Sequence, residues 1–204
     1  MTEEEAIPAS WTRICGLSLD RTTVGAVWLA HDRREKTIYV YGEYTGALPA
    51  LPILADAINT RCGQELPETP AWIPVIMDIR AFKRTEVEGA TLGGRLAGLG
   101  VPLNDGRYDE EAGAAELNKA LLSRRLKVGE TMRRWLAEVR TWNRSDEKGK
   151  LDKLPEAGFH LMRATGLALM LEPDDWISEN RAESDRRGGE SVMVDRSRNP
   201  VTGY

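Results

Sequence analysis

The stretch GAVWLAHDRREKTIYVYGEY, residues 25–44, decides the fold of this chain. Its first half is an apolar run rich in β-forming residues. In its second half, after a charged turn, Ile38 and Val40 alternate with tyrosines. Apolar runs on either side of a short charged turn are typical of paired antiparallel strands. We therefore predict two strands, over residues 24–30 and 37–44.

The neighbouring segments extend this pair into a sheet. Residues 12–19, TRICGLSL, are again rich in β-forming residues, and the polar turn 20–23 separates them from the next run. This order predicts an antiparallel meander of three strands. Downstream, residues 49–62 carry apolar side chains at helical spacing, and the short apolar run 72–77 predicts a buried fourth strand after a crossover helix.

The remaining chain alternates between helical and strand patterns. We predict helices over residues 91–98, 110–123, 129–142 and 156–171, and a short strand over residues 124–127. The helix over residues 129–142 gathers both of its tryptophans on one apolar stripe, which predicts that it covers a sheet. The whole order predicts an α/β fold with a mixed sheet flanked by helices.

Length and composition favour one globular domain. The 204 residues suffice for one core, and 41% hydrophobic with 29% charged residues is ordinary for a globular chain. No run approaches the roughly 18 apolar residues of a membrane helix, and the acidic N-terminus lacks the order of a secretory signal, so we expect a cytoplasmic protein with no membrane partner. We predict an acidic leader over residues 1–11, a domain over 12–184 and a flexible tail over 185–204.

The sequence argues against three kinds of site. It contains no GxxxxGK[ST] motif, so any ATPase motor is another chain. Cys15 and Cys62 form no CxxC pair and offer no zinc pattern with the two histidines, so we predict that both thiols are buried. The net charge of −4 argues weakly against a dedicated nucleic-acid binder.

Three stretches resemble the nuclease domain of phage terminase large subunits. Residues 25–44 are similar to the family's AVWLAxD followed by IYVYxEY, and residues 124–153, RRLKVGETMRRWLAEVRTWNRSDEKGKLDK, to its GRFKVFxxxxxWLxEFRxYxRxxxGKxVK. Residues 159–170, FHLMRATGLALM, are similar to its closing Asp-His-x-x-Asp-Ala-x-x-Tyr-Ala helix. The resemblance, from about Ile14 to Leu171, implies a ribonuclease H-like mixed sheet, with an antiparallel three-strand meander plus parallel strands.

The resemblance also implies a role in viral or prophage DNA packaging. In this family the domain cuts concatemeric DNA to genome length, using two divalent metal ions held by carboxylates from two strands and the closing helix. It implies double-stranded DNA, the terminase ATPase subunit and the portal as partners. It further implies Mg²⁺ or Mn²⁺ as the cofactor of an active enzyme, and the cytoplasm of the bacterial host as its location.

The chain departs from the family pattern at the acidic positions. The triplet GLS at residues 16–18 places Ser18 where the family has its first acid. Arg80, Phe159 and Arg163 stand where it has the second acid and the two aspartates of the closing helix. Because a guanidinium has no lone pair for a metal ion and stays protonated, we expect cleavage by the family mechanism to be weakened or lost.

Displaced acids offer an alternative. Side chains two residues apart on a strand share a face, so Asp20 lies on the face of Ser18 and Asp78 on the face of Arg80. A shift of one or two residues in the alignment also makes Asp78 itself the second acid. In an active enzyme Asp20 and Asp78 would be catalytic and hold the metal ions while water attacks the phosphate. The acids that could complete such a site are Glu43 and Glu156.

The same residues also have non-catalytic interpretations. Asp20 and Asp78 could form turns after their strands. Arg80 and Arg163 could form salt bridges with these aspartates, or hold a DNA phosphate without cutting it. We expect His160 to be a packed, hydrogen-bonded core residue. The chain would then be a DNA-binding or partner-docking module, or the remnant of a decayed prophage gene.

The basic segment over residues 124–153 indicates a face that follows a DNA backbone. The candidate DNA-binding residues are Arg124, Arg125, Lys127, Arg133, Arg140, Lys148 and Lys150. The alternative is a solvated helix face, on which basic residues pair with the acids Glu130, Glu138, Asp146 and Glu147.

Overall fold

The computed structural model describes residues 7–8, 10–64, 73–83, 91–104, 109–146, 158–173 and 176. In chain order, its elements are the strands β1 (Thr12–Leu19), β2 (Thr23–Asp32) and β3 (Thr37–Ala47), helix α1 (Leu51–Gln64), strand β4 (Val75–Met77), the 3-10 helix η1 (Ile79–Phe82), helices α2 (Leu92–Gly98) and α3 (Glu110–Leu122), strand β5 (Leu126–Val128), and helices α4 (Arg133–Asp146) and α5 (His160–Leu169). Several predictions fall outside the described residues: most of the leader, the tail, Glu147, Lys148, Lys150 and Glu156.

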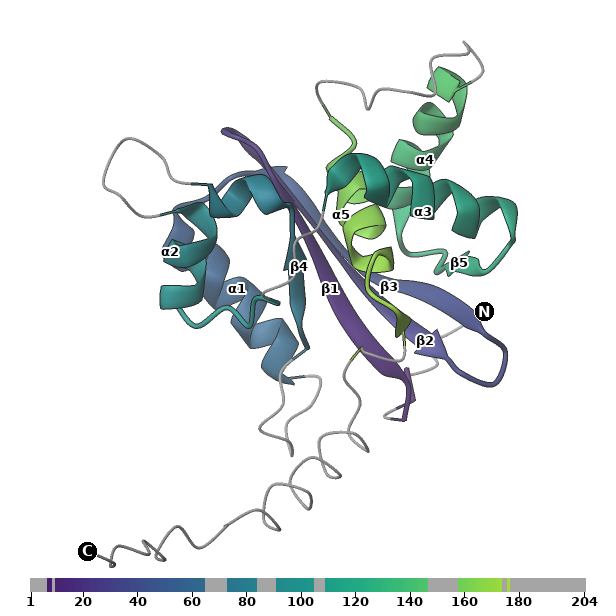
Figure 1. Ribbon diagram of the computed structural model, residues 1–204, viewed down its shortest axis with the longest axis horizontal. Helices are drawn as coiled ribbons and strands as arrows, with labels where there is room; N and C mark the ends of the chain where they lie inside the picture. The colour runs from purple at the N-terminus through teal and green to yellow at the C-terminus, as the bar shows by residue number, and fades with distance from the viewer. Residues whose placement is uncertain are drawn as a thin grey trace, which may run out of the picture.

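A five-stranded sheet in the order β4-β1-β2-β3-β5 forms the centre of the molecule (Figure 1). The pairs β1–β2 and β2–β3 are antiparallel, whereas β1–β4 and β3–β5 are parallel. Tight turns reverse the chain within the meander, while β4 and β5 each return to the sheet after a helix. The predicted mixed sheet, with a three-strand meander and added parallel strands, is confirmed.

Helices cover both faces of the sheet. Helices α1 and α2 lie over one face, where Cys15, Leu17 and Trp28 are buried. Helices α3, α4 and α5 lie over the other face, where Ile14 and Val27 are buried. The two cores follow from the alternation of side chains along β1 and β2, since successive residues of a strand point to opposite faces.

Helix α5 lies directly on the backbone of β1 and β2. A Cβ atom at Gly16 would come within 1.9 Å of the Ala164 carbonyl oxygen, and one at Gly25 within 2.6 Å of the His160 Cβ. Only glycine permits this approach. The first turn of α5 therefore lies beside the carboxyl end of β1.

Helices α3 and α5 cross at two facing glycines. A Cβ atom at Gly166 would lie 2.5 Å from the Gly113 carbonyl oxygen, and one at Gly113 would lie 2.8 Å from the Gly166 carbonyl carbon. Glu110 and Arg163 each stand three residues before the crossing in their own helix. Since residues three apart lie on one side of a helix, the crossing places these two side chains together.

Two helices begin later than the apolar periodicity predicts. Helix α4 begins at Arg133 and not at residue 129, and α5 begins at His160 and not at residue 156. In both cases a glutamate from another element accepts hydrogen bonds from amides of the first turn, Glu43 for α4 and Glu138 for α5. These partners are distant in sequence, so local periodicity does not reveal them.

Two further predictions concern the core and the membrane. Cys15 and Cys62 are both buried, as predicted. Within the described part of the chain, no helix is long and apolar enough to cross a membrane.

Candidate functional site

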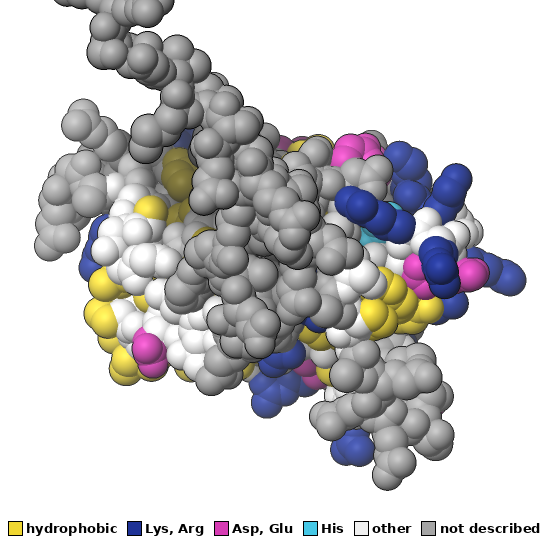
Figure 2. Space-filling view, turned by 90° about the horizontal axis from the view of Figure 1, so that it is seen from below, with side chains coloured by type: hydrophobic (Ala, Val, Ile, Leu, Met, Phe, Trp, Pro, Cys, Tyr) yellow, Lys and Arg dark blue, Asp and Glu magenta, His cyan; other side chains and the backbone are white. Residues whose placement is uncertain are grey.

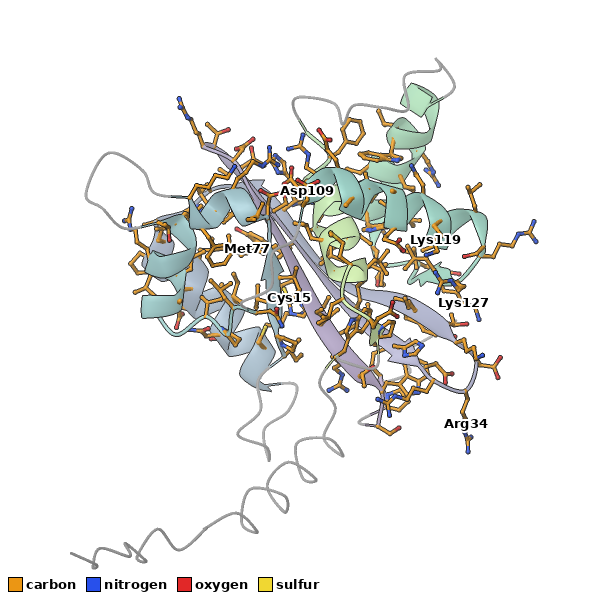
Figure 3. The ribbon with its side chains drawn as sticks, viewed as in Figure 1. Cys15, Arg34, Met77, Asp109, Lys119 and Lys127 are labelled. Atoms are coloured by element: carbon orange, nitrogen blue, oxygen red, sulfur yellow. The ribbon has the colours of Figure 1, made fainter. Side chains whose placement is uncertain are left out.

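The candidate site is a pocket of about 370 Å³ where β1 and β4 reach their carboxyl ends. In α/β folds with parallel strands, this end of the strands is the usual position for a ligand site. The apolar wall consists of Leu17, Leu19, Met77, Ala81 and Leu92. The charged lining consists of Asp20, Asp78, Arg80, Lys83, Glu110 and Arg163. Figure 3 labels Met77 in the wall and Asp109, the residue before Glu110.

Asp78 lines this pocket directly after the end of β4. Leu17 pairs with Met77 across the parallel strands, so the next residues, Ser18 and Asp78, are level with each other. Asp78, rather than Arg80, is therefore the residue that lies level with Ser18. Oδ1 of the buried Asp78 accepts hydrogen bonds from the backbone N and the Nε of Arg80, both at 2.7 Å, and Oδ2 accepts from the Glu110 backbone N at 3.0 Å.

Glu110 joins the charged groups of the pocket. Its buried carboxylate accepts a hydrogen bond from Ser18 Oγ at 3.4 Å through Oε1. Its Oε2 forms ion pairs with Arg80 Nη2 and with Arg163 Nη1, the second at 3.6 Å. One buried carboxylate thus contacts two guanidinium groups. Such an arrangement satisfies the rule that a buried charge needs a hydrogen-bonded partner of opposite sign.

Glu110 was not among the site residues predicted from the sequence. Asp109 caps α3 by accepting hydrogen bonds from the backbone N of Glu111 and Ala112, so an acidic run at this point has an ordinary explanation at a helix start. A usable signal was the helical spacing, because Glu110 lies on the buried stripe of α3 that also includes Gly113, Leu117 and Ala120. An acid on an apolar stripe indicates a buried carboxylate with a partner.

The two arginines differ in their surroundings. The Arg80 side chain is 61% exposed and that of Arg163 only 13%. The hydrogen bond to Asp78, together with the charge of Glu110, raises the pKa of Arg80 above its ordinary value, so this group stays protonated. The salt bridge anticipated between Arg80 and Asp78 is present, and Arg163 forms an ion pair with Glu110.

His160 links Ser18 to Asp20 at the edge of the pocket. Its Nε2 lies 3.2 Å from Asp20 Oδ2, and its Nδ1 lies 3.5 Å from Ser18 Oγ. The order of these groups is that of a serine hydrolase triad. However, Ser18 is only 2% exposed and its hydroxyl donates to Glu110, so it is not placed to attack a substrate. His160 is the packed, hydrogen-bonded residue that we predicted.

Asp20 both forms a turn and lines the pocket. Its Oδ1 accepts hydrogen bonds from the backbone N of Thr22 at 2.7 Å and of Thr23 at 2.6 Å. The hydrogen bond from Thr22 is the main reason that the pKa of Asp20 lies below its ordinary value. The turn-forming interpretation of Asp20 therefore describes its geometry, and the same side chain borders the cavity that Asp78 also lines.

Glu43 does not reach the pocket, which corrects its assignment to the predicted metal site. Its Oε1 accepts a hydrogen bond from the Arg134 backbone N at 3.1 Å, and its Oε2 from the Trp135 backbone N at 2.7 Å. A β-bulge shifts the register of β3 against β2 between Trp28 and Leu29. This bulge changes which β3 side chains face each side, and Glu43 meets the first turn of α4.

Glu138 performs the equivalent role for α5. Its Oε2 accepts hydrogen bonds from the backbone N of Leu161 and Met162, at 3.0 and 3.2 Å. Burial raises the pKa of the Glu138 carboxyl, even though these amides act in the opposite direction. Phe159, which stands at a family acid position, adopts a left-handed conformation before α5 and packs its ring against Trp142 at 5.4 Å. It is not among the residues that line the pocket.

The predicted DNA-binding residues lie away from the pocket. Arg124, Arg125 and Lys127 follow the carboxyl end of α3, whose 13 residues span about 20 Å from Glu110. Figure 3 shows Lys127 well apart from Asp109. The others within the described residues, Arg133 and Arg140, lie on α4, and all five are exposed. Glu138, considered as a partner for them, instead binds amides of α5.

Comparison with known proteins finds similar structures but no protein of similar sequence. No protein-family model matches the chain, and no curated protein matches its sequence. The structure of the P22 large terminase nuclease domain superposes with a TM-score of 0.65, at 15% sequence identity, over 86% of this chain and 88% of that chain.

The chain has the fold of a terminase nuclease domain. The sheet order and the helices on its two faces agree with the ribonuclease H-like α/β fold that the sequence resemblance implied. The structure of T. thermophilus RuvC in complex with Holliday junction substrate also matches, with a TM-score of 0.34 and 16% identity over 78% of this chain and 90% of that chain. That score is too low to support an argument.

The residues of the pocket do not fit the pair of divalent ions implied by a terminase nuclease domain. Both oxygens of Asp78 and both oxygens of Glu110 already accept hydrogen bonds or ion pairs from protein groups. Among the described residues, no group of three or more Asp, Glu, His or Cys side chains is placed to hold a metal ion. Hard cations such as Mg²⁺ need several oxygen ligands, and here guanidinium groups already neutralise the acids.

Proposed function

We propose that this chain is a viral or prophage DNA-packaging domain with the terminase nuclease fold that binds double-stranded DNA without cutting it by a two-metal mechanism. Its partners are DNA and the ATPase and portal of the packaging machine. The observation that carries the proposal is the double ion pair of Glu110 with Arg80 and Arg163. Two positive side chains are present in the pocket where a nuclease of this fold would need positive metal ions.

The electrostatics of the pocket support the loss of cleavage. A divalent cation entering beside Asp78 would meet the charge of Arg80 at the same carboxylate. Displacing Arg163 would require moving a largely buried cation away from Glu110. Breaking such a buried pair usually costs about 3–5 kcal/mol. Metal binding would therefore have to exceed this cost before any phosphodiester could react.

Nicking of supercoiled plasmid by the purified chain tests this proposal. We expect no nicking in Mg²⁺ or Mn²⁺ beyond that in EDTA, from protein shown to be folded by circular dichroism. An Asp20→Asn/Asp78→Asn double variant serves as the matched control. Metal-dependent nicking that disappears in this variant would establish a displaced two-metal site and would contradict the proposal.

A variant with restored acids provides a second test. Ser18→Asp/Arg163→Asp places carboxylates at two positions where the nuclease family has them. Ser18→Asn/Arg163→Asn is its control, because it has similar volumes without the added charge. Calorimetric titration with Mn²⁺ should show binding only in the aspartate variant. Stoichiometric Mn²⁺ binding by the unmodified chain would show that its arginines do not replace the metal ions.

A further inference from the structure

Two turns that are distant in sequence meet at one end of the sheet. Strand β5 pairs in parallel with the first residues of β3, where the Ile38 backbone N donates a hydrogen bond to the Arg125 carbonyl at 2.8 Å. Lys127 pairs with Tyr39 in this register. Lys36 precedes Tyr39 by three residues, or about 10 Å along an extended strand. The β2–β3 turn and the α3–β5 turn therefore form one continuous surface.

We name this surface the basic edge and define it by the exposed side chains Arg34, Lys36, Arg124, Arg125 and Lys127. Residues 33–36 and 124–127 together contain six Lys or Arg and one Glu, in a chain whose net charge is −4. Figure 2 shows Lys and Arg side chains gathered at this end of the molecule. The basic edge is thus a local cluster of positive charge in an acidic chain.

The contacts of the basic edge differ from those of the pocket. Among the residues that the structure describes, none of the five side chains forms an ion pair with an acid. Arg125 Nε donates to Ser123 Oγ at 3.2 Å, and Lys127 Nζ donates to the Tyr39 hydroxyl at 3.3 Å. Both partners are neutral. In the pocket, by contrast, Arg80 and Arg163 are each paired with a carboxylate.

Two of these cations occupy backbone positions that favour glycine. Lys36 has a φ of 50° and Arg124 a φ of 56°, both in the left-handed region. Side chains with a Cβ atom are disfavoured there, whereas glycine adopts this conformation readily. The local backbone therefore gives no reason for a long basic side chain at either position, while an electrostatic role does.

We propose that the basic edge binds the phosphate backbone of double-stranded DNA and that the pocket does not. This inference deepens the proposed function and rests on DNA being the partner. A duplex carries one negative charge per about 1.7 Å of its axis, which matches a row of exposed cations on two adjacent turns. The pocket offers no comparable attraction, because its arginines lie against acids that repel a phosphate.

A double glycine variant tests the surface without straining the fold. Lys36→Gly/Arg124→Gly removes two cations and leaves glycine where the backbone favours it, so we expect its Tm within about 3 °C of the unmodified chain. Fluorescence anisotropy with a short labelled duplex of random sequence measures binding. We expect the affinity to fall about tenfold, and the slope of log K against log salt to decrease in magnitude by about 2.

The matched control removes the same charge elsewhere. Arg21→Ala/Arg95→Ala takes two exposed cations from the β1–β2 turn and from α2, and should keep the affinity within about twofold. Equal losses in both double variants would overturn the basic edge as the binding surface, since net charge alone would then explain them. Undiminished binding by the glycine variant would overturn it as well.

The binding and nicking experiments distinguish a failure of the basic edge from a failure of the proposed function. DNA binding that survives the glycine variant refutes the basic edge and leaves the absence of metal-dependent nicking untouched. Binding of labelled polyglutamate by the unmodified chain, with no measurable binding of the duplex at the same salt concentration, would assign the basic edge to an acidic protein partner and would overturn DNA as its ligand.

Discussion

Two pairs of carboxylates in this chain are held in different ways. Asp78 and Glu110 lie in the pocket, where guanidinium groups bind them. Glu43 and Glu138 lie outside it, where backbone amides at the start of α4 and α5 bind them. The partners of the first pair are side chains that a substitution can remove. The partners of the second pair belong to the main chain and persist whatever the sequence of the helix.

One pair of carboxylates therefore belongs to the structural frame, and the other pair belongs to the site. The capping carboxylates fix where α4 and α5 begin, and hence where Arg163 stands. The pocket carboxylates determine what that position can bind. An acid in a nuclease fold is thus informative about catalysis only after its partner is known. Glu43 illustrates the point, since an acid in the sheet was a reasonable metal ligand until its amide partners were seen.

The largest expected effect comes from removing the buried guanidinium. Arg163→Met should lower the free energy of unfolding by about 3 kcal/mol, because Glu110 loses a partner within the protein. Urea denaturation measures this. Arg80→Met is the comparison variant, since Glu110 then keeps Arg163 and Asp78 keeps two backbone amides, and it should cost less than Arg163→Met. Equal losses in the two variants would contradict a buried role for Arg163.

A smaller effect is expected at the cap of α4. Glu43→Ala removes the acceptor of two first-turn amides and should cost about 1–2 kcal/mol in the free energy of unfolding. Glu43→Gln keeps one acceptor oxygen and should recover part of this loss. A metal ligand would behave differently, because the stability of the unmodified chain would then depend on added Mn²⁺. Thermal unfolding with and without Mn²⁺ separates the two roles.

Glu138 should make stability depend on pH. Burial raises the pKa of its carboxyl in the folded chain, so the stability associated with this group is complete below its ordinary pKa and is lost as pH rises through the folded value. Glu138→Gln removes this titration. We expect the variant to gain stability relative to the unmodified chain as the pH rises above 4.5 in urea denaturation. A constant difference above that pH would contradict the raised pKa.

The smallest effect is expected at Asp20, whose pKa is lowered mainly by the Thr22 amide. Its contribution to stability is present above the ordinary pKa of 3.8 and is lost as pH falls through the lower folded value. Asp20→Asn should therefore unfold more readily at neutral pH, and should match the unmodified chain in strong acid. The group is largely exposed, so added salt should reduce the difference.

Periodicity and turn residues predicted the sheet and most helices of this chain. Residues 24–30 and 37–44 form the expected strands because alternation and charged turns are local properties. The residues that line the pocket could not be predicted from local sequence patterns, because they come together only in the folded chain. Glu110 was read as part of an ordinary helix start, and its link to Arg163 depends on a helix crossing between segments about fifty residues apart in sequence. The contact of Glu43 with the first-turn amides of α4 was equally absent from local patterns, because Arg134 and Trp135 lie about ninety residues away in sequence.

The crossing of α3 and α5 at Gly113 and Gly166 has a consequence for how this site changes over generations. Because the two backbones touch there, positions 110 and 163 face each other whatever side chains they carry. Residues 110 and 163 specify the charged pair, and neither of them forms the contact between Gly113 and Gly166 that lets the helices approach. Substitutions at positions 110 and 163 therefore change which ions such a pocket accepts, while the same glycines keep the two helices in contact.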